Sequence, residues 1–216
     1  MSSFDSNSVT GVVLAGGKAT RMGGVDKGLV EVAGLAMIDH VVRRLQPQTG
    51  AIVINANRSR ESYASRGFPV VADAFGEYAG PLAGMAAGLA RIDTDWAVTV
   101  PCDSPLVPGD LVAGLGAALI DSDADLAVAE GAGRWQPVFA LLPRRLLPDL
   151  EAFLGEGGRK IDRWFGRHRV ATANFDHAPD AFLNINAPED KTALEERLAM
   201  SPDFGGPTPP EASRHG

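Results

Sequence analysis

Short apolar runs recur along the chain, and longer segments with helical periodicity separate several of them. The runs cover residues 9–15, 51–55, 70–72, 96–100, 126–129 and 138–142. Compact apolar runs bounded by turn residues predict buried strands, and strands that alternate with amphipathic helices are typical of a mostly parallel sheet. We therefore expect an α/β protein with a three-layer αβα, Rossmann-like arrangement.

Four helices are expected around these strands. Ile38, Val41, Val42 and Leu45 recur at the i, i+3, i+4, i+7 spacing of one helix face, and Pro47 follows this segment. This spacing predicts a crossover helix after the first strand. The remaining helices are expected at residues 81–92, 110–120 and 188–200.

Length and composition narrow the class of protein. The chain has 216 residues, so we expect a single domain over residues 9–200, with a flexible segment at residues 1–8. Residues 201–216 hold four prolines and three glycines, a composition that predicts a disordered tail. A net charge of −7 argues against broad nucleic-acid binding.

Cysteine usage and hydropathy indicate the compartment. Cys102 is the only cysteine, which excludes an intrachain disulfide and suits a reducing environment. The first eight residues lack an apolar signal core, and no apolar run is long enough to span a bilayer. A cytoplasmic protein that binds neither nucleic acid nor membranes is the expectation.

A glycine-rich, basic loop follows the first strand. Gly16 and Gly17 begin it, and Lys18, Arg21 and Lys27 add positive charge, so the loop can bring backbone N–H groups and cations to a phosphate. Ala19 stands where a Walker A loop has its Ser or Thr, and the adjacent glycines break the dinucleotide pattern G-x-G-x-x-G. The loop therefore indicates a nucleotide site of another type, in which Arg21 and Lys27 stabilise a pyrophosphate leaving group.

Polar residues stand at the ends of three further strands. Asn55, Asp73 and Asp103 each follow an apolar run, and in open parallel sheets ligands bind beyond these carboxyl ends. Asp103 suits Mg²⁺, which takes one or two protein carboxylates plus phosphate oxygens, or it is a turn aspartate. Asn55 and Asp73 are expected to contact base or ribose, or are ordinary turn formers. Cys102 is expected to be a small buried residue without chemistry.

The glycine loop also carries a family resemblance. Leu14-Ala-Gly-Gly-x-x-x-Arg-Met-Gly-Gly-x-Asp-Lys-Gly-Leu29 resembles the signature of the molybdenum cofactor guanylyltransferases, members of the nucleotide-diphospho-sugar transferase-like superfamily. Further similar motifs follow in the family's order, and the likeness extends over about residues 10–198. They are Asn55-Ala-Asn-Arg58, Gly80-Pro-Leu-Ala-Gly-Met85, Pro101-Cys-Asp-Ser-Pro105 and Phe182-Leu-Asn-Ile-Asn-Ala-Pro-Glu189.

The resemblance implies transfer of GMP from GTP to the terminal phosphate of molybdenum-molybdopterin, with release of pyrophosphate. It places Asn184 and Asn186 near the pterin, with polar packing at strand ends as the alternative, and it implies Mg²⁺ on Asp103. Protein partners that insert molybdenum or mature molybdoenzymes are expected from the family alone. The residues that it implies for GTP binding are Leu14, Ala15, Gly16, Lys27, Asn55, Asp73 and Asp103, to which the glycine loop adds Gly17.

Two other functions fit the same pattern. One is a cytidylyl- or sugar-1-phosphate nucleotidyltransferase of the same architecture, and the other is a noncatalytic nucleotide-binding adaptor. Relatives that use CTP tend to have Leu-Ala-Ala-Gly where this chain has Leu14-Ala-Gly-Gly17. The missing methyl group favours the larger guanine, so we expect GTP as the donor.

Overall fold

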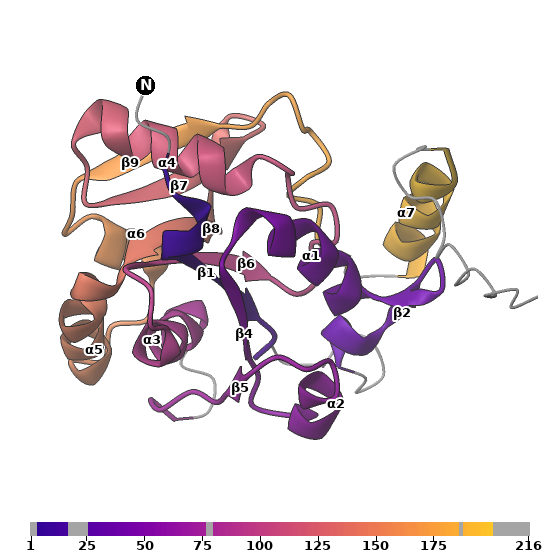
Figure 1. Cartoon of the computed structure of the whole chain (residues 1–216), viewed down its shortest axis with the longest axis horizontal. Coiled ribbons are helices and arrows are strands. Elements are labelled where there is room, and N and C mark those ends of the chain that lie inside the picture. Colours follow the sequence, from indigo (N-terminus) through magenta and orange to yellow (C-terminus); the bar gives the residue numbers. More distant parts are fainter. Residues whose placement is uncertain (1–3, 17–25, 77–79, 186–187, 201–216) are drawn as a thin grey trace, which may run out of the picture.

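A seven-stranded, mostly parallel sheet forms the centre of the computed structural model (Figure 1). The model describes residues 4–16, 26–76, 80–185 and 188–200. Neighbouring strands pair in parallel, except that β8 runs antiparallel to both β6 and β7. In spatial order the strands are β5 (Val70–Val71), β4 (Ala51–Asn55), β1 (Val9–Leu14), β6 (Trp96–Pro101), β8 (Arg134–Pro143), β7 (Leu126–Gly131) and β9 (Val170–Asn174).

Helices cover both faces of this sheet and bury two separate clusters of apolar side chains. On one face α1 (Met37–Leu45) and α4 (Leu111–Ser122) pack over Val13 of β1. On the other face α3 (Pro81–Arg91), α5 (Leu147–Gly155) and α6 (Ile161–Phe165) pack over Val12. Adjacent residues of a strand point to opposite faces, so β1 contributes to both clusters and the layers are helix, sheet, helix.

The predicted apolar runs all lie in strands, whereas several other elements escape the hydrophobic pattern. Strand β9 buries only the small side chains of Ala171 and Ala173, so its pattern is weak. Strands β2 (Glu31–Val32) and β3 (Leu35–Ala36) are too short to show a period, and they pair through a turn in which Ala33 and Gly34 have positive φ. The short helix α2 (Arg60–Ala64), α5 and α6 were also not expected from the sequence.

The two ends of the described chain pack differently. Phe4 packs edge-on against Trp96 at 5.4 Å between ring centroids, and Asp5 caps the turn at Ser6–Ser8. At the other end α7 (Pro188–Met200) packs against β2 through a small cluster that includes Val32 and Leu194. The tail predicted at residues 201–216 lies outside the described residues. Among the described helices, none has the length and apolar character needed to cross a membrane.

Candidate active site

A cavity of about 430 Å³ lies where the strands of the parallel half of the sheet end. Strands β4, β1 and β6 are adjacent and parallel, so Leu14 lies in register with both Asn55 and Pro101. The pairing continues past the strands, since Ala15 N donates to Asn55 O at 2.8 Å and Cys102 N donates to Leu14 O at 3.1 Å. The lining residues are Leu14, Ala15, Gly16, Asp26, Lys27, Asn55, Asp73, Gly80, Pro81, Gly84, Pro101, Cys102, Asp103 and Val138.

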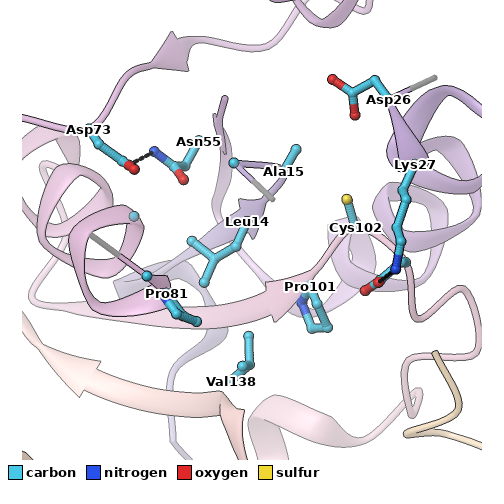
Figure 2. A pocket seen from close by; sticks show the side chains of 14 residues that line it. Leu14, Ala15, Asp26, Lys27, Asn55, Asp73, Pro81, Pro101, Cys102 and Val138 are labelled. Atoms are coloured by element: carbon cyan, nitrogen blue, oxygen red, sulfur yellow. Dashed lines mark hydrogen bonds and ion pairs between the residues drawn. The ribbon is translucent and has the colours of Figure 1, made fainter. Parts of the chain in front are cut away.

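The structure brings most of the expected nucleotide-site residues to this one cavity. They are Leu14, Ala15, Gly16, Lys27, Asn55, Asp73 and Asp103. Figure 2 shows the bonded pair Asn55 and Asp73 at one end and Lys27 at the other, with Leu14 and Ala15 between them. Gly17, Arg21 and Asn186 lie outside the described residues.

At one end of the cavity, a lysine and a carboxylate form an ion pair. Lys27 Nζ donates to Asp103 Oδ2 at 3.2 Å, and the two side chains are 22% and 18% exposed. Lys27 begins a 3-10 turn at Lys27–Leu29, and Asp103 follows β6. The backbone of Asp103 is held as well, because Ile185 N donates to its carbonyl oxygen at 3.0 Å. This end therefore offers both a cation and a fixed carboxylate to phosphate groups.

The carboxylate of Asp103 fits a magnesium ion in one particular mode. In the described part of the chain, no three His, Cys, Asp or Glu side chains gather as a metal cluster. Mg²⁺ is commonly held by one or two carboxylates together with substrate phosphates and waters, rather than by a cage of protein ligands. The carboxylate of Asp103, which lines the cavity, matches that mode.

At the other end, two asparagines hold one aspartate. Asn55 Nδ2 donates to Asp73 Oδ1 at 2.8 Å, and Asn57 Nδ2 donates to Asp73 Oδ2 at 2.8 Å. The backbone N–H of Asp73 donates in turn to Asn57 Oδ1 at 2.9 Å. Asn57 was not expected as a site residue. It lies beyond the end of β4, so strand alternation does not mark it, and its role depends on the contact with Asp73.

Behind the cavity wall, a buried tyrosine fixes Asp26, which the sequence analysis also missed. Tyr63 is fully buried, and its hydroxyl donates to Asp26 Oδ1 at 2.5 Å. Burial raises the pKa of Tyr63 far above its usual range, so the hydroxyl remains a donor. A Cβ on Gly28 would lie 2.5 Å from this hydroxyl oxygen, and therefore only glycine lets the loop after Lys27 pack this closely.

Cys102 is buried, as predicted, although it also lines the cavity. Burial, reinforced by the nearby Asp103 carboxylate, raises the pKa of its thiol well above the usual range. The neutral thiol is a poor nucleophile, since thiolate is the reactive form. Cys102 therefore contributes to the wall rather than to the chemistry.

Two further parts of the cavity wall do not come from the carboxyl ends of parallel strands. Helix α3 begins beside the cavity, and a Cβ on Gly84 would overlap Asn55 Oδ1, so a glycine there lets the helix press against the amide. Val138 enters from the antiparallel strand β8. No signal in the sequence marks Val138, because its position depends on the order of strands in the sheet.

Asn184, expected near the acceptor, does not line this cavity. Its Oδ1 accepts from Ser104 Oγ at 2.6 Å, and it borders a smaller neighbouring hollow of about 240 Å³. Ser104 directly follows Asp103, so the hydrogen bond ties this segment to the loop that carries the carboxylate. Asn184 is thus adjacent to the Lys27–Asp103 end of the cavity and not within it.

Comparison with known proteins shows the family. The family model described as "MobA-like NTP transferase domain" matches residues 11–172. A molybdenum cofactor guanylyltransferase of Shewanella sp. strain MR-4 is 49% identical over 193 residues, which are 89% of this chain and 98% of that protein. One from Cupriavidus pinatubonensis is 51% identical over 183 residues, 82% of this chain and 92% of that protein.

Solved structures agree on the architecture. The crystal structure of molybdopterin-guanine dinucleotide biosynthesis protein A from Archaeoglobus fulgidus superposes with a TM-score of 0.74 at 24% identity, over 89% of this chain and all of that one. The predicted nucleotide-diphospho-sugar transferase-like α/β fold is thereby confirmed. From the extent of the sequence match and the shared fold, this chain belongs to the MobA-like NTP transferase family.

Proposed function

We propose that this nucleotidyltransferase moves GMP from GTP to the terminal phosphate of molybdenum-molybdopterin, forming molybdopterin guanine dinucleotide and pyrophosphate. The observation that carries the proposal is the division of one cavity into two polar ends. Asn55 and Asp73 stand at the first, and Lys27 and Asp103 at the second. The names of the relatives with about half their residues identical support the same reaction.

The Asn55–Asp73 end suits a guanine base. A carboxylate accepts two hydrogen bonds side by side, and guanine presents N1–H and N2–H₂ as adjacent donors. Asn55 adds an amide that can donate and accept. Cytosine presents a different edge, with an acceptor at N3, so the same carboxylate would recognise it poorly. On this basis the donor is GTP rather than CTP.

The Lys27–Asp103 end suits the triphosphate. Lys27, together with Arg21 from the glycine loop, would neutralise the departing pyrophosphate, while Gly16 and Gly17 would let backbone N–H groups approach the phosphates. Asp103 would hold Mg²⁺, which would supply positive charge to the phosphates. Asn184 would face the acceptor beside this end.

The transfer needs positioning more than a base. A phosphate monoester has a second pKa of about 6, so its oxygen is already anionic at neutral pH. That oxygen attacks the α-phosphorus of GTP, a new P–O bond forms, and the bond from the α-phosphorus to the bridging oxygen of pyrophosphate breaks. The cavity contributes by holding donor and acceptor in line and by compensating charge on the leaving group.

The proposal extends to the setting of the reaction. We place the catalytic unit at residues 9–200 as one domain, in the cytoplasm, with the proteins that insert molybdenum or mature molybdoenzymes as its partners. Small-molecule substrates are the ligands that a cavity of this size and lining can accept.

The decisive experiment is mass analysis of the product after the protein is mixed with Mg²⁺, molybdenum-loaded molybdopterin and either GTP or CTP. The expected product is the guanine dinucleotide, with one pyrophosphate released for each, and CTP should give little turnover. Comparable transfer from CTP would point to a cytidylyltransferase instead. GTP binding without any transfer would favour a noncatalytic adaptor.

A further inference from the structure

Asn57 holds Asp73 from outside the cavity. Among the described residues that line the cavity are Asn55 and Asp73, but not Asn57. Both polar atoms of the Asn57 amide are nevertheless used on Asp73, one on the carboxylate and one on the backbone N–H. Because Asn57 is directed at Asp73 and does not line the cavity, its effect on a ligand in the cavity is expected to pass through Asp73.

The contact between Asn57 and Asp73 continues the pairing of β4 with β5 beyond the ends of these two strands. Strands β4 and β5 pair in parallel, and Ala56 N donates to Val71 O at 2.8 Å after β4 has ended. The Asn57 side chain then replaces the next backbone pair, reaching Asp73 two residues further along. These hydrogen bonds connect Asp73 to the segment that follows β4, so its position depends on the edge of the sheet.

The orientation of the Asp73 carboxylate is fixed as well. Asn55 donates to Oδ1 and Asn57 donates to Oδ2, so rotation of the carboxylate would break one hydrogen bond or the other. Each carboxylate oxygen can accept about two hydrogen bonds, so both oxygens keep capacity for a ligand. A Cβ added at Gly16 would lie 3.2 Å from Asn57 Nδ2, so Gly16 lies close to this pair of side chains.

We propose that Asn57 is a positioning residue for base recognition, which fixes Asp73 so that it can accept from both N1–H and N2–H₂ of a guanine. The inference rests on the proposed function, because it takes a guanine nucleotide as the donor. The inference goes beyond the proposed function, because it assigns selectivity for guanine over other purines to Asn57, a residue that does not touch the base. The N2 amino group is the part of the base that should depend most on the carboxylate angle.

The experiment compares GTP with inosine triphosphate, which lacks the N2 amino group, in the wild type and Asn57→Ala. Dissociation constants are measured by calorimetry with Mg²⁺ present. The wild type should prefer GTP by about tenfold or more, since an unmade hydrogen bond to a carboxylate is costly. In Asn57→Ala that preference should fall roughly tenfold, while kcat at saturating GTP stays within about threefold.

The chain offers a matched control at the far edge of the sheet. Asn174 Nδ2 donates to Asp176 Oδ2 at 2.9 Å, and Asp176 N donates to Asn174 Oδ1 at 2.9 Å, so Asn174 makes the same pair of bonds at the end of β9. Asn174→Ala removes an equivalent clamp away from the cavity. It should leave the GTP preference unchanged, which separates an effect on the base from a general loss of stability.

The outcomes discriminate between the two proposals. Equal transfer from GTP and CTP by the wild type, in the product assay with molybdenum-loaded molybdopterin, overturns the proposed donor and the inference with it. A wild type that uses GTP over CTP but binds GTP and inosine triphosphate equally overturns the inference alone. A wild type that prefers GTP, with the preference intact in Asn57→Ala, overturns the inference alone. Melting temperatures are recorded first, and if Asn57→Ala does not fold, Asn57→Ser is measured under the same criteria.

Discussion

The two halves of the sheet end in similar polar residues but use them differently. In the half formed by β5, β4, β1 and β6, Asn55, Asp73 and Asp103 converge on one cavity. In the half formed by β8, β7 and β9, the clamp of Asn174 on Asp176 lies on the surface. The same asparagine–aspartate pairing therefore borders a cavity in one half and forms only a surface turn in the other.

The direction of β8 explains the difference. After β7 the chain turns back at once through Ala132 and Gly133, both with positive φ, and returns as an antiparallel strand. Parallel strands need a crossover connection, which leaves a crevice where neighbouring connections diverge. A hairpin occupies the space beyond the strand ends instead. The connection between strands, rather than the identity of the residues, decides which polar strand ends face a cavity.

The largest effect on kcat should come from removing a charge at the Lys27–Asp103 end of the cavity. Asp103→Asn keeps the side-chain shape but loses the charge that pairs with Lys27 and would hold Mg²⁺. Removing a group that stabilises developing charge typically costs about 10²–10³ in kcat, and Lys27→Ala should fall in the same range. Pyrophosphate release at saturating GTP measures the loss, and thermal unfolding should show that both variants fold.

Asp125→Asn is the corresponding substitution in the other half. Asp125 pairs with Arg145 and Arg169 on the surface, and it does not border the cavity. Its kcat should equal that of the wild type. Equal losses in Asp103→Asn and Asp125→Asn would contradict the distinction between the halves, since the effect would then follow charge and not position.

A smaller effect, on GTP affinity, is expected where helix α3 contacts Asn55 at the Asn55–Asp73 end of the cavity. In Gly84→Ala the new methyl group would overlap Asn55 Oδ1 and lie 3.0 Å from Leu14 Cδ2, so the amide must move. Overpacking of this kind costs about 1–3 kcal/mol. Where GTP binding must restore the amide to its original place, the same cost raises the dissociation constant for GTP by about 5- to 150-fold. Titration of GTP by calorimetry checks this expectation.

Gly155→Ala is the control for the helical glycine. It changes the last residue of α5, where a Cβ meets no atom within 4 Å. Alanine favours helix over glycine by about 1 kcal/mol, so the melting temperature should rise or stay level and GTP affinity should not change. If Gly84→Ala also left GTP affinity unchanged, helix α3 would not position Asn55.

The sequence predicts the strands better than it predicts their contacts. The apolar runs located β7 and β8 as well as β1, β4, β5 and β6, and the polar ends of the parallel strands were expected to meet, because parallel neighbours end at one edge. Asn57 was missed since its role depends on a contact with Asp73, 16 residues away. Val138 was missed because a periodic pattern says nothing of strand order. Arg21 and Gly17 rest on the resemblance and the loop's composition alone.

The smallest expected effect concerns stability at the amino ends of β7 and β9. Hydrogen bonds from the Arg169 backbone, then from the Arg145 and Arg169 side chains, lower the pKa of Asp125 to about 2. The unfolded value is about 3.9, so this carboxylate stabilises the fold fully above pH ~4 and loses its contribution as pH falls toward 2. Both arginine side chains are more than half exposed, so solvent screening should limit the contribution to about 1 kcal/mol or less.

Asp125→Asn should therefore lower the melting temperature by only a few degrees at pH 7. The difference from the wild type should shrink as pH falls from about 4 toward 2, because the wild-type carboxylate then gains a proton and loses its charge-assisted bonds. Thermal unfolding measured from pH 7 to pH 2 tests this trend. A gap that stays constant over that range would mean that the aspartate acts through its shape and backbone hydrogen bond. In that case the two halves would differ in geometry alone, and charge at this edge would play no part in the fold.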